Sequence, residues 1–201
     1  MEITQDDAQR ALQDIAAVSD RTKRALSLGP APEILMLWGL VWMCCYAGNQ
    51  FASQLSGPIW LVGVAAGTIG SCALGYRSSK SVTKTDGTKD PNIGKIGLAW
   101  CALFGYAVLW VFILDPNGGE RSGELASMQT SAFIATIPMF GYVVGGLWLG
   151  RFYVWLGLIV TAITMVGLLG FPQFFWIWMA FFGGGALFAT GLYMRKVWAN
   201  A

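Results

Sequence analysis

The sequence predicts an all-α membrane protein with six transmembrane helices, arranged as three hairpins, and one cytoplasmic amphipathic helix ahead of them. Composition is the first reason: 55% of the 201 residues are hydrophobic and 12% are charged, whereas soluble domains carry about 25% charged residues. The mean hydropathy of +0.55 agrees with this. The second reason is a set of six apolar segments, each long enough to cross a hydrocarbon core of about 30 Å. The third is a hydrophilic stretch, residues 77–95, which carries five of the thirteen Lys and Arg residues.

Residues 1–32 precede the first apolar segment and predict the cytoplasmic amphipathic helix. Apolar residues recur there at helical spacing, and the Gly and Pro residues at positions 29–32 end the pattern. The apolar stripe is narrow and rich in Ala, without the large residues of a helix that inserts strongly into a membrane. We expect it to pack on a partner helix or on the protein's own cytoplasmic face, and a solvated juxtamembrane helix that helps to set topology is the alternative. The candidate partner-binding residues are Leu12, Ile15 and Val18.

The transmembrane domain covers residues 33–201. Its short connections, at Gly150–Arg151 and Pro172–Gln173, predict antiparallel neighbours. The longer connections are a cytoplasmic loop over residues 77–95 and an outer loop over residues 115–125. The predicted spans are Ile34–Leu55, Pro58–Tyr76, Ile96–Leu114, Ala126–Leu149, Phe152–Phe171 and Phe174–Met194.

Cationic residues lie almost entirely on one side of the predicted spans. With six spans, both termini share a side with the 77–95 loop, and that side holds every Lys and Arg residue except Arg121. Cations next to transmembrane segments are retained in the cytoplasm. The sequence therefore predicts a multi-pass protein of the bacterial inner (cytoplasmic) membrane with both termini inside. Trp residues near the span ends, such as Trp60 and Trp176 on the outer side, are interpreted as an aromatic belt.

Several kinds of chemistry are excluded by missing residue types. The sequence has no histidine, which excludes His-ligated haem, His-based zinc sites and Ser-His-Asp or Cys-His catalysis. No Asp, Glu, Lys or Arg lies inside a predicted span, and such residues mark proton relays and ion paths. The four cysteines lie in apolar segments without a CxxC motif and are expected to be buried free thiols. We therefore expect no enzymatic activity, no catalytic residue, no metal and no cofactor.

Glycines spaced four residues apart recur in the second and fourth predicted spans. Small residues let transmembrane helices approach closely, because lipid supplies no hydrophobic drive for their association. We expect these glycines to serve helix packing within the chain, and a homodimer contact along the fourth span is the alternative. The helix-packing candidates are Gly63, Gly67, Gly141, Gly145, Gly146 and Gly150.

A second set of residues falls near the middle of the predicted membrane. A proline interrupts the fourth span and three consecutive glycines interrupt the sixth, and helix breaks at this depth form binding sites in transporters. The set is a candidate midplane cavity or gate for a neutral or apolar ligand; alternatively, nearby hydroxyl groups satisfy the carbonyl that the proline frees. Its members are Tyr46, Thr68, Tyr106, Thr136, Pro138, Thr161, Thr164, Gly183, Gly184 and Gly185.

The N-terminal quarter carries a resemblance. The runs DDAQRALQDI and RTKRAL, the break at Pro30 and Pro32, and LWGLVWMCCYAGNQ together resemble a family of uncharacterised bacterial multi-pass membrane proteins. Members of that family pair a charged N-terminal cytoplasmic helix with several spans and are often encoded beside helix-turn-helix regulators. The resemblance implies no catalytic residue and favours sensing or partner binding. The layout of one helix and six spans is also similar to that of some ABC exporter permeases.

Two functions are compatible with these patterns. The first is a non-enzymatic membrane protein that acts as a sensing or scaffolding module through its cytoplasmic helix. The alternative is a small transporter, channel or ABC-type permease subunit for a neutral or apolar solute. The expected partners are the lipid bilayer and either a second copy or a cytoplasmic protein. Nucleic acid is not expected, because the net charge is only +2.

Overall fold

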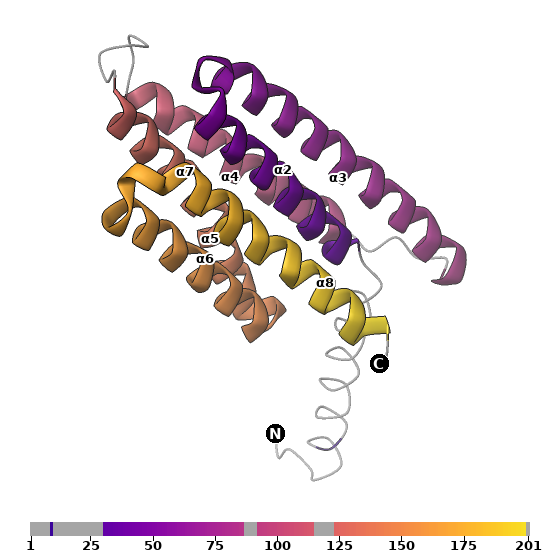
Figure 1. The fold of residues 1–201 in the computed structure, drawn as a ribbon. Coiled ribbons are helices and arrows are strands. Elements are labelled where there is room, and N and C mark those ends of the chain that lie inside the picture. The colour runs from indigo at the N-terminus through magenta and orange to yellow at the C-terminus, as the bar shows by residue number, and fades with distance from the viewer. Residues whose placement is uncertain (1–8, 10–29, 87–91, 115–122, 200–201) are drawn as a thin grey trace.

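The computed structural model describes residue 9 and residues 30–86, 92–114 and 123–199 (Figure 1). Every element in these ranges is helical. The predicted N-terminal helix lies outside them, apart from residue 9. In chain order the elements are α2 (Ala31–Phe51), η1 (Ser53–Leu55), α3 (Ser56–Asp86), α4 (Asn92–Leu114), α5 (Glu124–Leu149), α6 (Arg151–Gly170), η2 (Pro172–Phe174), α7 (Phe175–Trp178), the π-helical segment η3 (Met179–Gly184) and α8 (Gly185–Ala199).

The helices have the lengths that crossing a membrane requires. Five stretches in the described part are long and apolar enough, and the last runs from Pro172 to Val197 through α7, η3 and α8. The remaining helix, α4, has 23 residues, and its apolar stretch Leu98–Trp110 covers most of the part whose side chains are described. The predicted all-α membrane fold with six membrane-length helices is therefore confirmed.

The sharp connections form where the sequence places backbone breakers. Gly150 alone separates α5 from α6, and its φ of 133° is a conformation that residues with a side chain rarely adopt. Pro172 starts the short η2 turn before α7, because its fixed φ suits a first helical position. Both connections occur at the predicted positions.

The hydrophilic stretch 77–95 differs from its prediction as a loop. The backbone of α3 stays helical to Asp86, and α4 already begins at Asn92. Neither Gly nor Pro occurs between Gly75 and Gly87, so nothing local stops the helix after the apolar residues end. The polarity of this stretch therefore does not mark where the helix ends.

The core is built from α2, α5, α6 and the α7–α8 arm. The most extensive contacts are those of α5 with α6 and of α2 with α8, and η3 also packs on α2. By contrast, α3 lies along the outer side of α2 (Figure 1), and only 6% of its apolar window is buried. The buried residues at the centre of the core include Leu35, Met139, Val160, Met179 and Leu187.

Candidate functional site

The candidate midplane residues divide between the core and the surface. Thr68 and Tyr106 are exposed on α3 and α4, so they lie outside the core that holds most of the others. The remaining members are buried or half-buried in α2, α5, α6, η3 and α8. The structure therefore does not gather the full predicted set around one space.

Two threonine hydroxyls of this set are bonded within their own helices. Thr164, fully buried in α6, donates to the Val160 carbonyl at 2.9 Å. Thr136 in α5 donates to the Phe133 carbonyl at 2.9 Å. Bonds of this kind are a common way for Ser and Thr to satisfy their hydroxyls inside transmembrane helices. These hydroxyls therefore serve helix geometry in this structure.

The two predicted helix breaks face different neighbours. Pro138 is buried in α5, which packs on α6 and α4. Gly184 ends the π-helical segment and meets α2: a Cβ atom there would lie 2.7 Å from Met43 Cγ and 2.9 Å from the Gly39 carbonyl oxygen. Gly183 is also buried, with Met179 and Trp42 as its nearest side chains, whereas a Cβ at Gly185 would enter open space. Gly184 thus lets η3 lie against α2.

The helix-packing glycines mostly meet neighbouring helices of the same chain. A Cβ at Gly63 would strike Cys45 Sγ, and Gly67 faces the Trp38 ring, both across the α2–α3 interface. Gly141 faces Leu103 of α4, and a Cβ at Gly146 would lie 2.6 Å from the Val154 backbone nitrogen of α6. Gly145 is half-buried in α5, and Gly150 forms the α5–α6 turn.

Tyr46 is the centre of an aromatic cluster that the sequence analysis does not predict. The Tyr46 side chain is 1% exposed, and its ring centroid lies 5.0 Å from that of Trp60, 5.8 Å from Trp42, 6.2 Å from Trp176 and 6.4 Å from Phe175. Edge-to-face pairs such as those with Trp42, Trp60 and Phe175 are the preferred aromatic geometry. The interpretation of Trp176 as part of an aromatic belt is wrong, because it is buried here. The signal for this cluster in the sequence is that aromatic residues occur at the same depth in three of the predicted spans.

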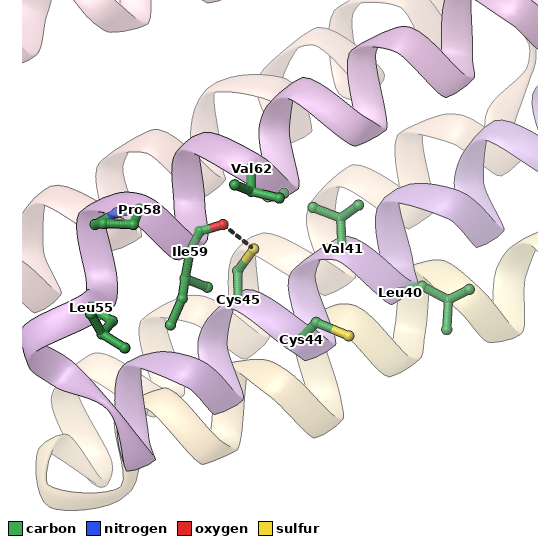
Figure 2. A pocket seen from close by; sticks show the side chains of 9 residues that line it. Leu40, Val41, Cys44, Cys45, Leu55, Pro58, Ile59 and Val62 are labelled. Atoms are coloured by element: carbon green, nitrogen blue, oxygen red, sulfur yellow. Dashed lines mark hydrogen bonds between the residues drawn. The ribbon is translucent and has the colours of Figure 1, made fainter.

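A hollow of about 530 Å³ lies between α2 and α3, and sequence reasoning missed it (Figure 2). Its lining is wholly apolar, and it is a shallow groove that is open over most of its extent. Figure 2 shows Cys45 pointing from α2 toward α3, where its thiol donates to the Ile59 carbonyl at 3.7 Å. We call it the α2–α3 hollow, and its lining residues are Leu40, Val41, Cys44, Cys45, Leu55, Pro58, Ile59, Val62 and Gly63.

The cysteines are free thiols, as expected. The expectation that all four are buried is wrong: only Cys45 is buried, and Cys44, Cys72 and Cys101 are exposed on the surface of the bundle. Within the residues described, no three His, Cys, Asp or Glu side chains are placed to hold a metal ion. The α2–α3 hollow can therefore bind an apolar group whose shape fits its lining.

The candidate partner-binding residues Leu12, Ile15 and Val18 lie outside the described residues. Compared with known proteins, the chain matches no family model, no curated relative and no solved structure. Its class therefore rests on the chain itself: an all-helical bundle whose helices are long and apolar enough to cross a membrane is a multi-pass membrane protein.

Proposed function

We propose that this chain is a non-enzymatic sensing or scaffolding module of the bacterial inner membrane, with both termini in the cytoplasm, and that it acts through its N-terminal helix. A partner bound by that helix would be tied to the membrane through α2. The resemblance of the N-terminal runs to a family with a charged cytoplasmic helix favours the same role.

The observation that carries the proposal is the way α2 is anchored. Pro32, in its first turn, is buried, and a Cβ at Gly191 of α8 would lie 2.6 Å from the Pro32 carbonyl oxygen. The rest of α2 packs on α3, η3 and α8. The N-terminal segment is therefore joined to a fixed point of the core, so a force or a bound partner on that segment acts on the whole bundle.

The transporter alternative receives less support. Thr136 and Thr164 use their hydroxyls on their own helices, and Thr68 and Tyr106 lie on the surface. A midplane path for a neutral or apolar solute needs residues of several helices that converge on one space, and these candidates do not converge. The proposal of a sensing or scaffolding module does not need such a path.

The experiment changes the apolar stripe of the N-terminal helix. Ile15→Asp with Val18→Asp is expected to release a cytoplasmic partner, or to abolish self-association, in purification from native membranes. The matched control is Gln13→Asp with Ala17→Asp, which adds the same charge on the opposite side of the helical wheel. The control is expected to keep the partner and the oligomer profile of the wild type.

Correct insertion must be verified in both variants. In a background without the native cysteines, a Cys placed at Gly118 should react with an impermeant reagent from outside, and a Cys placed at Thr85 should not. Equal losses in both double variants, or unchanged profiles in both, would contradict the proposal. A reversed labelling pattern would contradict the predicted orientation.

A further inference from the structure

The α2–α3 hollow is an apolar groove that the proposed function does not use. Leu40 to Cys45 lie at and just past the middle of α2, and Pro58 to Gly63 lie in the first turns of α3. The hollow therefore occupies the half of the bundle next to the α2–α3 turn. We propose that it holds one hydrocarbon chain of a membrane lipid from the leaflet on that side. This proposal stands on the hollow alone, whatever the N-terminal helix binds.

The volume and the lining decide the class of ligand. About 530 Å³ is as large as many small-molecule sites, which measure about 300–1,000 Å³, but this hollow is open over most of its extent and can cover only one side of a ligand. The lining is wholly apolar, and the thiol of Cys45 is already bonded to the Ile59 carbonyl. A polar solute would lose its hydrogen bonds to water there without replacement. A hydrocarbon chain loses none.

The two walls of the hollow are held in place before any ligand binds. Below the hollow, the Trp38 Nε1–H donates to Ser71 Oγ at 3.1 Å across α2 and α3. At the turn, the Ser56 hydroxyl donates to Asn49 Oδ1 at 2.7 Å, and Asn49 is buried. Bonds at both ends keep the helices at a set distance, so little ordering remains to oppose binding.

Dispersion, and not the hydrophobic effect, must hold the hydrocarbon chain of the lipid in the hollow. Lipid tails are as apolar as the lining, so transfer from bilayer to hollow gains nothing from the removal of water. An unfilled hollow of this size deprives its lining side chains of contact partners. A chain seated along Leu40, Cys44 and Val62 restores those contacts, and its residence depends on fit.

The surroundings favour a lipid without a charge-anchored head group. The exposed residues next to the hollow at η1 are Ser53 and Gln54, which are neutral. Arg77 follows Gly63 on α3 by fourteen residues, or about 20 Å along a helix axis. Arg77 is therefore out of reach of an ion pair with the head group of a lipid seated in the hollow.

The test uses the full chain in vesicles of phosphatidylethanolamine and phosphatidylglycerol that contain a phospholipid with a photoactivatable diazirine in its acyl chain. After irradiation and digestion, mass spectrometry locates the adducts. We expect adducts at Leu40, Cys44 and Val62 to exceed by about tenfold those at Leu61 and Cys72, which are exposed but outside the hollow, because a seated chain keeps contact with the lining.

Filling the hollow provides the matched variants. Cys44→Trp places an indole in the hollow, whereas Cys72→Trp makes the same change at an exposed thiol elsewhere. Cys44→Trp should lower the yield of lipid adducts at the hollow residues about tenfold, since the indole occupies the space in which the acyl chain makes its contacts. Cys72→Trp should leave that yield unchanged. If Cys44→Trp does not fold, Val62→Trp with Leu61→Trp repeats the comparison, since these side chains are 67% and 74% exposed.

Three results would overturn the proposal. Adducts spread evenly over the exposed faces of α3 would mean ordinary boundary lipid. Equal adduct yields in Cys44→Trp and Cys72→Trp would mean that the hollow holds no chain. Cross-links from the hollow to a second copy of the protein, in place of lipid adducts, would mean that another helix fills it.

Discussion

The helices α8 and α3 both pack along α2 (Figure 1), and they do so in different ways. At the α2–α8 side, Gly39, Gly184 and Gly191 bring backbone against backbone: a Cβ at Gly39 would lie 2.7 Å from the Phe188 nitrogen. At the α2–α3 side, Gly67 and Gly70 face the ends of side chains. The arm containing α8 is 44% buried over its apolar window, against 6% for α3.

The difference shows that a glycine pattern does not by itself reveal how tightly two helices pack. A backbone atom cannot move away from a new side chain without shifting its helix, whereas a side chain can change rotamer. The α2–α8 side is therefore expected to be intolerant of added volume. The α2–α3 side tolerates it and leaves room for the α2–α3 hollow.

The largest effect is expected where α2 faces the aromatic cluster. Tyr46→Ala should destabilise the detergent-solubilised protein by about 3–5 kcal/mol, the range for removal of a large buried ring. Tyr106→Ala removes the same atoms at a residue that is 66% exposed and should change stability by less than about 0.5 kcal/mol. Unfolding in mixed micelles with increasing SDS measures both. Similar losses for the two variants would contradict the placement of Tyr46 at the centre of the core.

Substitution by Ala is expected to have opposite effects on stability at two glycines that contact opposite sides of α2. Gly184→Ala should cost about 1–3 kcal/mol, because the new methyl group meets the backbone of Gly39 and Met43. Gly70→Ala meets only a terminal methyl of Leu37, which can rotate away. That change should be neutral or stabilise α3 by up to about 1 kcal/mol. The same SDS titration measures both, and an equal cost at Gly70 would show that α3 packs as rigidly as α8.

The smallest effect is expected at the hydrogen bond between α2 and α3. Trp38→Phe removes the donor to Ser71 and should cost about 0.5–1.5 kcal/mol, the usual net value of one hydrogen bond. Trp155→Phe, at a residue that is 63% exposed, is the matched control and should leave the stability unchanged. No difference between the two variants in thermal unfolding would mean that this bond does not hold α3 in place.

Local features of the sequence predicted the elements well and their partners poorly. Gly150 and Pro172 mark helix boundaries locally, because glycine can adopt the positive φ of the α5–α6 turn and proline fixes its φ at a first helical position. The hydrophilic residues after Tyr76 predict a loop, whereas α3 continues to Asp86 because no helix breaker occurs before Gly87. The glycine pattern indicated close packing, but its local spacing could not say that Gly146 meets α6 and Gly63 meets α2.

The candidate sites were harder to predict, because local sequence does not reveal which neighbour a side chain contacts. Thr164 and Tyr106 both lie near the middle of an apolar segment, yet one is fully buried and the other exposed. Depth along the membrane normal can be read by counting residues, but the direction of a side chain around its helix cannot when every face is apolar. Amphipathic periodicity, the usual guide to that direction, is weak in helices that face lipid on one side and protein on the other.

The sequence by itself determined that the chain is helical, how many membrane-length segments it has and where Gly150 and Pro172 divide them, because hydrocarbon thickness and backbone breakers act locally. Only the tertiary structure decided that α2 is anchored on α8, that Tyr46 collects four aromatic rings and that a hollow remains beside α3. In lipid no hydrophobic drive selects one apolar face over another. The selection comes from the fit between surfaces, which exists only once the helices are assembled.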